Sequence, residues 1–264
     1  GVNVKTNGNN GWTYDNKRYW NKTATYNFYA IAPYAPANGS YSFANTGMFS
    51  ITGAKSALAT ESDDFLIDRN GDVGISGADP RTVSFDFHHI MAKVAFYVNK
   101  SSDISEVVTI KNLTMTGWDN GAGKFVQTET ATPNTLSHTE WTIPTSVEGT
   151  AVIISEDKVL SLAADSTGCN TYIMVPQTIN YVAAEGETAE QGLTFNIEYT
   201  ITYGDGFVET VNYKKVVDAA QTWGTDSYTK YTLTIGASSE IEFDVTSICG
   251  FCNDGGNTSV PVQP

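Results

Sequence analysis

One stretch of alternating apolar residues, residues 83–98 (VSFDFHHIMAKVAFYV), constrains the fold of this chain more than any other feature. Its apolar side chains recur at every second position, which is the period of a β-strand and not that of a helix. The alternation runs through Phe87 to Met91 and resumes at Val94 on the opposite parity. Such a change indicates a bulge, or a bend where the strand leaves one sheet edge for another. The stretch predicts a core strand of a β-protein.

A second alternating segment predicts a β-hairpin. Apolar residues occupy every second position of residues 193–203, a Gly-Asp-Gly turn follows, and residues 207–217 return. The positions between them, from Thr194 to Thr202, are all polar, so we expect one face in the core and the other in solvent. Two further strands are predicted within residues 222–235 and 238–245, on the alternating residues 231–235 and 241–245. The only helix-like piece, residues 56–60, is too short to be stable alone.

Length and composition allow two domains of ordinary size or one large β-domain, and they exclude some functions. The chain has 264 residues with 41% hydrophobic and 12% aromatic content, enough to bury a core. Its formal net charge of −14 argues against nucleic acid binding, because phosphate recognition needs a basic surface. No run of 18 apolar residues exists to span a membrane. The polar opening GVNVKTNGNNG resembles the inside of a loop, and we expect strands and a targeting segment to precede it.

The central stretch also resembles a known family. Phe87, His89, Ala92, Lys93 and Val94 read F-x-H-x-x-A-K-V, which is similar to the signature strand of the fimbrillin-like surface proteins of Bacteroides-type bacteria. Further motifs resemble this family in the same order along the chain. They are Trp12, Tyr19 and Trp20; Phe28, Ala30 and Pro33; the strand ending in Pro176 and Gln177; and the C-terminal residues Trp223, Gly224, Leu233, Ile235, Ile241, Phe243 and Val245.

The resemblance implies a fold and a function. Fimbrillins have two β-sandwich domains with a transthyretin-like strand layout, so we expect an all-β chain with few short helices. We place an N-terminal domain at residues 1–102, lacking its first strands, and a C-terminal domain with an extended tail at residues 103–264. The resemblance further implies an exported outer-membrane lipoprotein precursor, passing through the periplasm to the cell surface. It also implies a secreted, non-enzymatic fimbrium or pilus subunit for cell adhesion, with no cofactor.

The tail, residues 255–264, is the candidate assembly element. Fimbrillins assemble by strand exchange, in which a strand of one subunit fills a groove in the next. The segment TSVPV, residues 258–262, alternates like a short strand, although Pro261 restricts it to an edge. The partners implied are other pilus subunits, with host or bacterial receptors or glycans as further candidates. A disordered terminus is the alternative for this tail.

Two groups of residues could hold a metal, and neither predicts a site. His88 and His89 are adjacent, so on a strand they point to opposite faces, and the only other histidine is His138. The acidic stretch of residues 68–79 places Asp68, Asn70, Asp72 and Asp79 at calcium-loop spacing. However, Val73 replaces the required glycine and no helices flank the stretch. We expect a solvated acidic turn and leave calcium binding open.

The cysteines and carboxylates predict no catalysis. Cys249 and Cys252 form C-G-F-C after the last strand, where no helix N-terminus activates a thiol, and we leave a bridge between them open. With Cys169 the count is odd, so at most one disulfide can form. No G-x-S-x-G motif occurs, and nothing marks a pair of acidic residues as a glycosidase. We predict no catalytic, cofactor-binding or metal-binding residues. A calcium- or carboxylate-dependent hydrolase is the third alternative function.

The alternative function is a monomeric glycan-binding β-sandwich. Trp12 and Trp20 lie in turn-like sequence, where exposed indoles could stack on sugars, although core packing is the commoner role of tryptophan. The sequence leaves open whether the chain is a stalk, tip or anchor subunit, and it identifies no receptor.

Overall fold

The computed structural model describes residues 4–6, 12–14, 21, 23–43, 48–74, 83–128, 137–138, 141–185, 189–236, 241–249 and 260–262. These residues form strands and no helix, which confirms the predicted all-β class. The short helices expected beside the strands do not occur in this part of the chain. Residues 56–60 instead contain β6 (Ala57–Leu58), because Leu58 and Ala57 pair with β16 (Tyr172–Met174). Accordingly, no described helix is long and apolar enough to cross a membrane.

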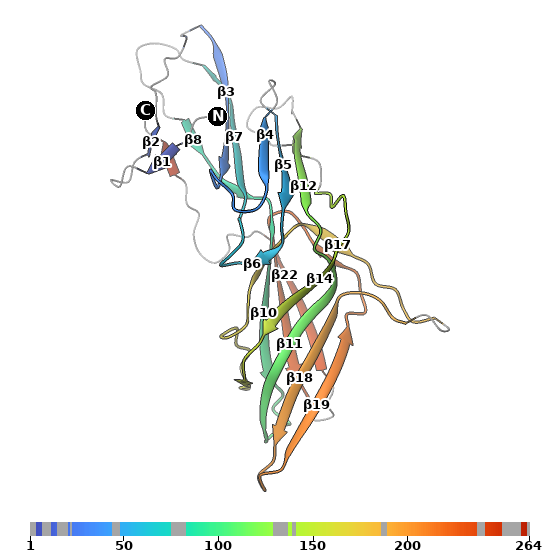
Figure 1. The fold of residues 1–264 in the computed structure, drawn as a ribbon. Helices are drawn as coiled ribbons and strands as arrows, with labels where there is room; N and C mark the ends of the chain where they lie inside the picture. Colours follow the sequence, from blue (N-terminus) through green and yellow to red (C-terminus); the bar gives the residue numbers. More distant parts are fainter. Residues whose placement is uncertain are drawn as a thin grey trace.

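Two sheets form the lower part of the molecule (Figure 1). The first has the order β22-β21-β10-β16-β6, with β10 at Ala92–Lys100, β21 at Ser227–Ile235 and β22 at Ile241–Cys249. The second has the order β14-β11-β18-β19, with β11 at Val107–Asp119, β14 at Glu148–Ile154, β18 at Thr194–Thr202 and β19 at Val208–Val216. Three short strands complete this part: β15 (Lys158–Val159) beside β11, and β17 (Gln177–Ile179) paired with β20 (Gln221–Trp223).

The larger hydrophobic core lies between these two sheets. Val94, Phe96 and Val98 alternate along β10 and are buried, as their spacing predicts. The Phe96 ring stacks on Tyr231 of β21 at 5.8 Å between centroids and meets Phe195 of β18 edge-on at 6.1 Å. Burying such aromatic side chains supplies most of the packing energy of a sandwich.

The predicted hairpin is confirmed as β18 and β19. The two strands pair in continuous antiparallel register from Thr194 opposite Val216 to Thr202 opposite Val208. At the turn Gly206 has a φ of 85°, which glycine adopts without steric cost, and Asp205 accepts a hydrogen bond from the Phe207 amide. The outward face differs from the expectation at two positions. Thr194 and Thr200 are only 6% and 9% exposed, so other parts of the chain partly cover this face and solvent does not contact all of it.

The upper part of the molecule contains smaller sheets (Figure 1). One has the order β13-β12-β5-β4, with β4 at Ser40–Phe43, β5 at Phe49–Ala54, β12 at Gly123–Thr128 and β13 at Ser137–His138. Another has the order β3-β7-β9, with β3 at Thr25–Ala32, β7 at Leu66–Gly74 and β9 at His88–His89. In addition, β1 (Val4–Thr6) pairs with β2 (Trp12–Tyr14), and β8 (Val83–Phe85) pairs with β23 (Val260–Val262). As predicted, β3 ends immediately before Pro33.

A second core cluster lies among β5, β7 and β12 of this upper part. Phe49, Phe65, Phe125 and Trp141 are its largest buried side chains, and Phe125 lies 5.4 Å from Trp141 between ring centroids. The Trp141 indole N–H donates to the backbone oxygen of Ile90 over 2.6 Å. This bond satisfies a buried polar group of the connecting segment before β10.

The boundary placed after residue 102 stays a prediction. Strand pairing crosses that position in both directions: β10 pairs with β21, and β12 pairs with β5. Each core therefore contains residues from both sides of residue 102.

We predict that Phe96→Ala lowers the free energy of unfolding by about 3–5 kcal/mol, because it leaves a cavity between the two sheets. Urea denaturation followed by tryptophan fluorescence measures this loss. Thr210→Ala on the exposed side of β19 is the matched control and should change stability by less than about 0.5 kcal/mol. A Phe96→Ala loss as small as the control's would contradict the placement of this ring.

Candidate functional site

The stretch of residues 83–100 divides among three sheets. Its first part, β8, pairs with β23; its middle, β9, pairs with β7; and its last part, β10, pairs with β21 and β16. Between β9 and β10 the amide of Ile90 donates to the backbone oxygen of Phe65. Of the two alternatives predicted for this stretch, a bulge or a change of sheet, the structure has the change of sheet.

The C-terminal segment pairs with the first part of this stretch. Val260 lies opposite Phe85, Pro261 opposite Ser84 and Val262 opposite Val83, in antiparallel register. Val83 is buried at 8% exposure. Thus a strand does form within the predicted segment 258–262, and it occupies a sheet edge, the position to which proline is confined. We call β8 the receiving edge and β23 the tail strand.

Asp68 on β7 holds the chain directly after the receiving edge. Its carboxylate accepts hydrogen bonds from the amide of Asp86 and from its own neighbour Arg69, each over 2.6 Å. Burial raises the pKa of Asp68 above its ordinary value, and this outweighs the lowering by the two amide bonds. The carboxylate thus fixes the backbone where the chain turns from β8 towards β9.

The two adjacent histidines do not converge, as predicted. His88 is exposed, whereas Nδ1 of the half-buried His89 lies 2.8 Å from a carboxylate oxygen of Asp64. The acidic stretch is an extended strand over residues 68–74, paired with β3, and not the loop that calcium requires. Asp79 lies outside the described residues. Within the described part of the chain, no group of three or more His, Cys, Asp or Glu side chains could hold a metal.

The remaining sequence candidates are placed only in part. Cys169 is free and partly buried, and burial raises the pKa of its thiol to about 11. The side chain of Cys249 and all of Cys252 lie outside the described residues, so their bridge stays a prediction. The side chain of Trp12 and the whole of Trp20 also lie outside them, and the proposed sugar-stacking role of these indoles stays a prediction too.

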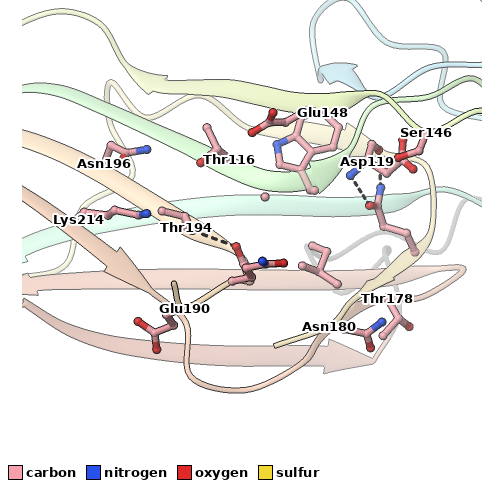
Figure 2. Close-up of a pocket in the computed structure, with 16 residues that line it drawn as sticks. Thr116, Asp119, Ser146, Glu148, Thr178, Asn180, Glu190, Thr194, Asn196 and Lys214 are labelled. Carbon is pink, nitrogen blue, oxygen red and sulfur yellow. Dashed lines mark hydrogen bonds between the residues drawn. The ribbon is translucent and has the colours of Figure 1, made fainter. Parts of the chain in front are cut away.

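Sequence reasoning missed a polar hollow beside β11, β14 and β18 (Figure 2). It is open to solvent and has a volume of about 630 Å³. At one wall β11 has a register shift between Thr116 and Trp118, with Gly117 at a φ of 80°. A Cβ on Gly117 would lie 2.1 Å from the backbone oxygen of Gly192, so only glycine permits this close approach. The glycine was visible in the sequence, but its contact with Gly192 was not.

Asp119 and Gln177 form the rigid end of the hollow. The Gln177 side-chain oxygen accepts from the Asp119 amide at 2.8 Å, and its NH₂ group donates to the Asp119 carbonyl at 2.9 Å. The Asp119 carboxylate accepts from the amides of Gly121 and Val147 at 2.8 and 2.9 Å. Burial raises the pKa of Asp119, but these two amide bonds and a hydrogen bond from the Ser146 side chain hold the pKa below its ordinary value. Asp119 is therefore ionised at neutral pH.

We predict that Asp119→Asn lowers the unfolding free energy at pH 7 by roughly 1 kcal/mol, because charged acceptors make stronger hydrogen bonds. The folded pKa lies below the unfolded value of 3.8, so the carboxylate's contribution is present above about pH 4 and is lost as pH falls through the folded pKa. Urea denaturation of both proteins at pH 7 and pH 2 measures this difference. A gap that does not shrink at pH 2 would contradict the assigned role.

Comparison with known proteins places this architecture in a family. The sequence model of a protein family described as fimbrillin-like matches residues 1–247 of this chain. A fimbrial protein from Bacteroides vulgatus shares 15% sequence identity and a TM-score of 0.57, over 90% of this chain and 81% of that one. A putative cell adhesion protein from Bacteroides uniformis shares 13% identity and a TM-score of 0.46, over 92% and 78%. No curated protein matches significantly. Through the family match, the chain belongs to the fimbrillin-like family.

Proposed function

We propose that this protein is a non-enzymatic fimbrial subunit of the bacterial cell surface that assembles by strand donation. The tail strand β23 is the donor, and the receiving edge β8 of the next subunit is the acceptor. The observation that carries the proposal is the antiparallel pairing of Val260–Val262 with Val83–Phe85. Family membership supports the fimbrial role, and the name of the Bacteroides vulgatus neighbour agrees with it.

The chemistry of the receiving edge favours exchange between subunits. A sheet edge carries backbone N–H and C=O groups that any strand of suitable register can satisfy. Every copy of the chain carries the same tail, so a neighbour's tail makes the same bonds as the subunit's own. At this edge donation therefore forms the same backbone hydrogen bonds, and only the chain that supplies β23 changes.

The tail is long enough to serve either copy. Ten residues separate Cys249, the end of β22, from Val260, the start of β23. Eleven residue steps span at most about 38 Å when fully extended. A tail of this reach can occupy the edge of its own subunit or that of a neighbour.

Pairing within one chain competes with pairing between chains. A tethered strand has an effective concentration on the order of millimolar at its own edge. Isolated subunits therefore cap themselves, and assembly must gain further contacts between subunits to exceed that concentration. Pro261 donates no backbone hydrogen bond, so the tail strand is held weakly enough to exchange.

Surface delivery belongs to the same proposal. We infer export through the periplasm as an outer-membrane lipoprotein precursor, in line with family membership. The net charge of −14 suits an exposed protein that must not adsorb to anionic cell surfaces.

One prediction of strand donation concerns the register of the tail strand. In a chain whose native cysteines are serine, Ser84→Cys with Pro261→Cys places two thiols opposite each other. We expect oxidation to give a cross-linked monomer in dilute solution and a covalent ladder of oligomers in assembled protein, both resolved by non-reducing electrophoresis. Pro261→Cys with Thr210→Cys is the control, because β19 does not pair with β23. Assembled protein that yields no ladder would refute donation in this register.

Another prediction of strand donation concerns the affinity of the tail for the receiving edge. A chain truncated before Gly255 exposes the receiving edge, and a synthetic peptide of residues 255–264 should bind it. A ligand that binds only the folded state raises the melting temperature, by an amount equivalent to about 2.7 kcal/mol at a hundred times its Kd. We expect a saturable rise that a scrambled peptide does not produce. An equal effect of both peptides, or none, would remove this tail as the donor.

A further inference from the structure

The polar hollow lies on the sandwich face directed away from the larger core. Thr116 of β11, Glu148 of β14, Asn196 of β18 and Lys214 of β19 line it, and Figure 2 shows their side chains around one space. A second hollow of about 330 Å³ continues along β18 and β19 and shares Asn196 and Lys214 with the first. Together they form one elongated polar surface.

The side chains of the hollow divide into fixed and available groups. Asp119, Gln177 and Thr194 are fixed by hydrogen bonds to the backbone. Glu190 accepts a hydrogen bond of 2.8 Å from the Tyr181 hydroxyl. By contrast, the described residues provide no hydrogen bond or ion pair to the side chains of Glu148, Asn180, Asn196 and Lys214. These four supply amide, carboxylate and ammonium groups from separate elements.

The lining excludes most classes of ligand. Three carboxylates, Asp119, Glu148 and Glu190, outnumber the single ammonium of Lys214, which disfavours phosphates and acidic sugars. The lining is mostly polar, which disfavours lipids. Trp118 is only 5% exposed, so its ring offers no aromatic platform to a ligand. Among uncharged ligands, this polar lining favours one with many hydroxyl groups.

We propose that this hollow binds a short neutral oligosaccharide. Sugar hydroxyls both donate and accept, as do the amides of Asn180 and Asn196, while Glu148 accepts and Lys214 donates. The volume of about 630 Å³ falls within the usual range of ligand pockets. The hollow is built from one chain and is distinct from the receiving edge, so it is present whether or not subunits assemble.

Binding by one hollow is weak, because little apolar surface is buried. In a fibre the same hollow recurs in each subunit, and multivalent contact with a glycan-coated surface raises the effective affinity without new contacts. This would give the fimbrial subunit an adhesive role in addition to its structural one.

The test titrates the full-length chain with neutral trisaccharides ending in galactose, mannose or N-acetylglucosamine, followed by saturation-transfer NMR. A sialylated trisaccharide is the anionic probe. We expect saturable binding of at least one neutral probe, unchanged by added salt because the ligand carries no charge. Binding of no neutral probe at 10 mM, or of the sialylated probe alone, overturns the proposal.

Variants locate the binding. Glu148→Ala and Asn196→Ala each remove one hydrogen-bonding group, and each should weaken binding by roughly three- to tenfold. Glu242→Ala, an exposed carboxylate on β22 of the other sheet, is the matched control and should leave binding unchanged. Circular dichroism verifies that every variant is folded. Neutral-sugar binding that survives both hollow variants unchanged overturns the assignment, whatever the result for the tail strand.

Discussion

Backbone hydrogen bonding along residues 83–100 is the constraint on which the rest of the structure depends. This single segment must satisfy its N–H and C=O groups in three successive sheets, first beside β23, then beside β7, then between β21 and β16. Its buried side chains are divided in the same way: Val83 lies in the upper part of the molecule and Phe96 lies in the larger core. The receiving edge and the central strand of the sandwich are thus parts of one continuous chain, separated by only a few residues.

The proximity of these parts has a mechanical consequence. Residues 90 and 91 connect both cores: Trp141 donates to the Ile90 oxygen, and the Asp226 amide donates to that of Met91 at 3.1 Å. A tail strand bound at β8 is therefore coupled through a short, hydrogen-bonded path to the strands of the sandwich. In the fibre that we propose, a pulling force would pass through backbone hydrogen bonds and packed aromatic rings in series.

The sequence predicted those elements whose periodicity is local. The alternation in residues 193–203 and the Gly-Asp-Gly turn were sufficient for the β18–β19 hairpin. The parity change after Met91 indicated either a bulge or a change of sheet, and only the strand pairing of the fold decides between them. Residues 56–60 were misleading because pairing of Leu58 with Tyr172 overrides a weak helical preference. The polar hollow could not be predicted, since it depends on the contact of Gly117 with Gly192, which are distant in sequence.

The most direct test of strand donation is amide hydrogen–deuterium exchange at residues 83–85, read by mass spectrometry. Donation through the receiving edge predicts slow exchange in the full chain, fast exchange once residues 255–264 are removed, and renewed protection when an intact subunit is added to supply its tail. The full chain serves as the reference for the other two states. If the amides of residues 83–85 in the truncated chain exchange equally fast with and without the intact subunit, no tail is donated between subunits and the proposed assembly is wrong.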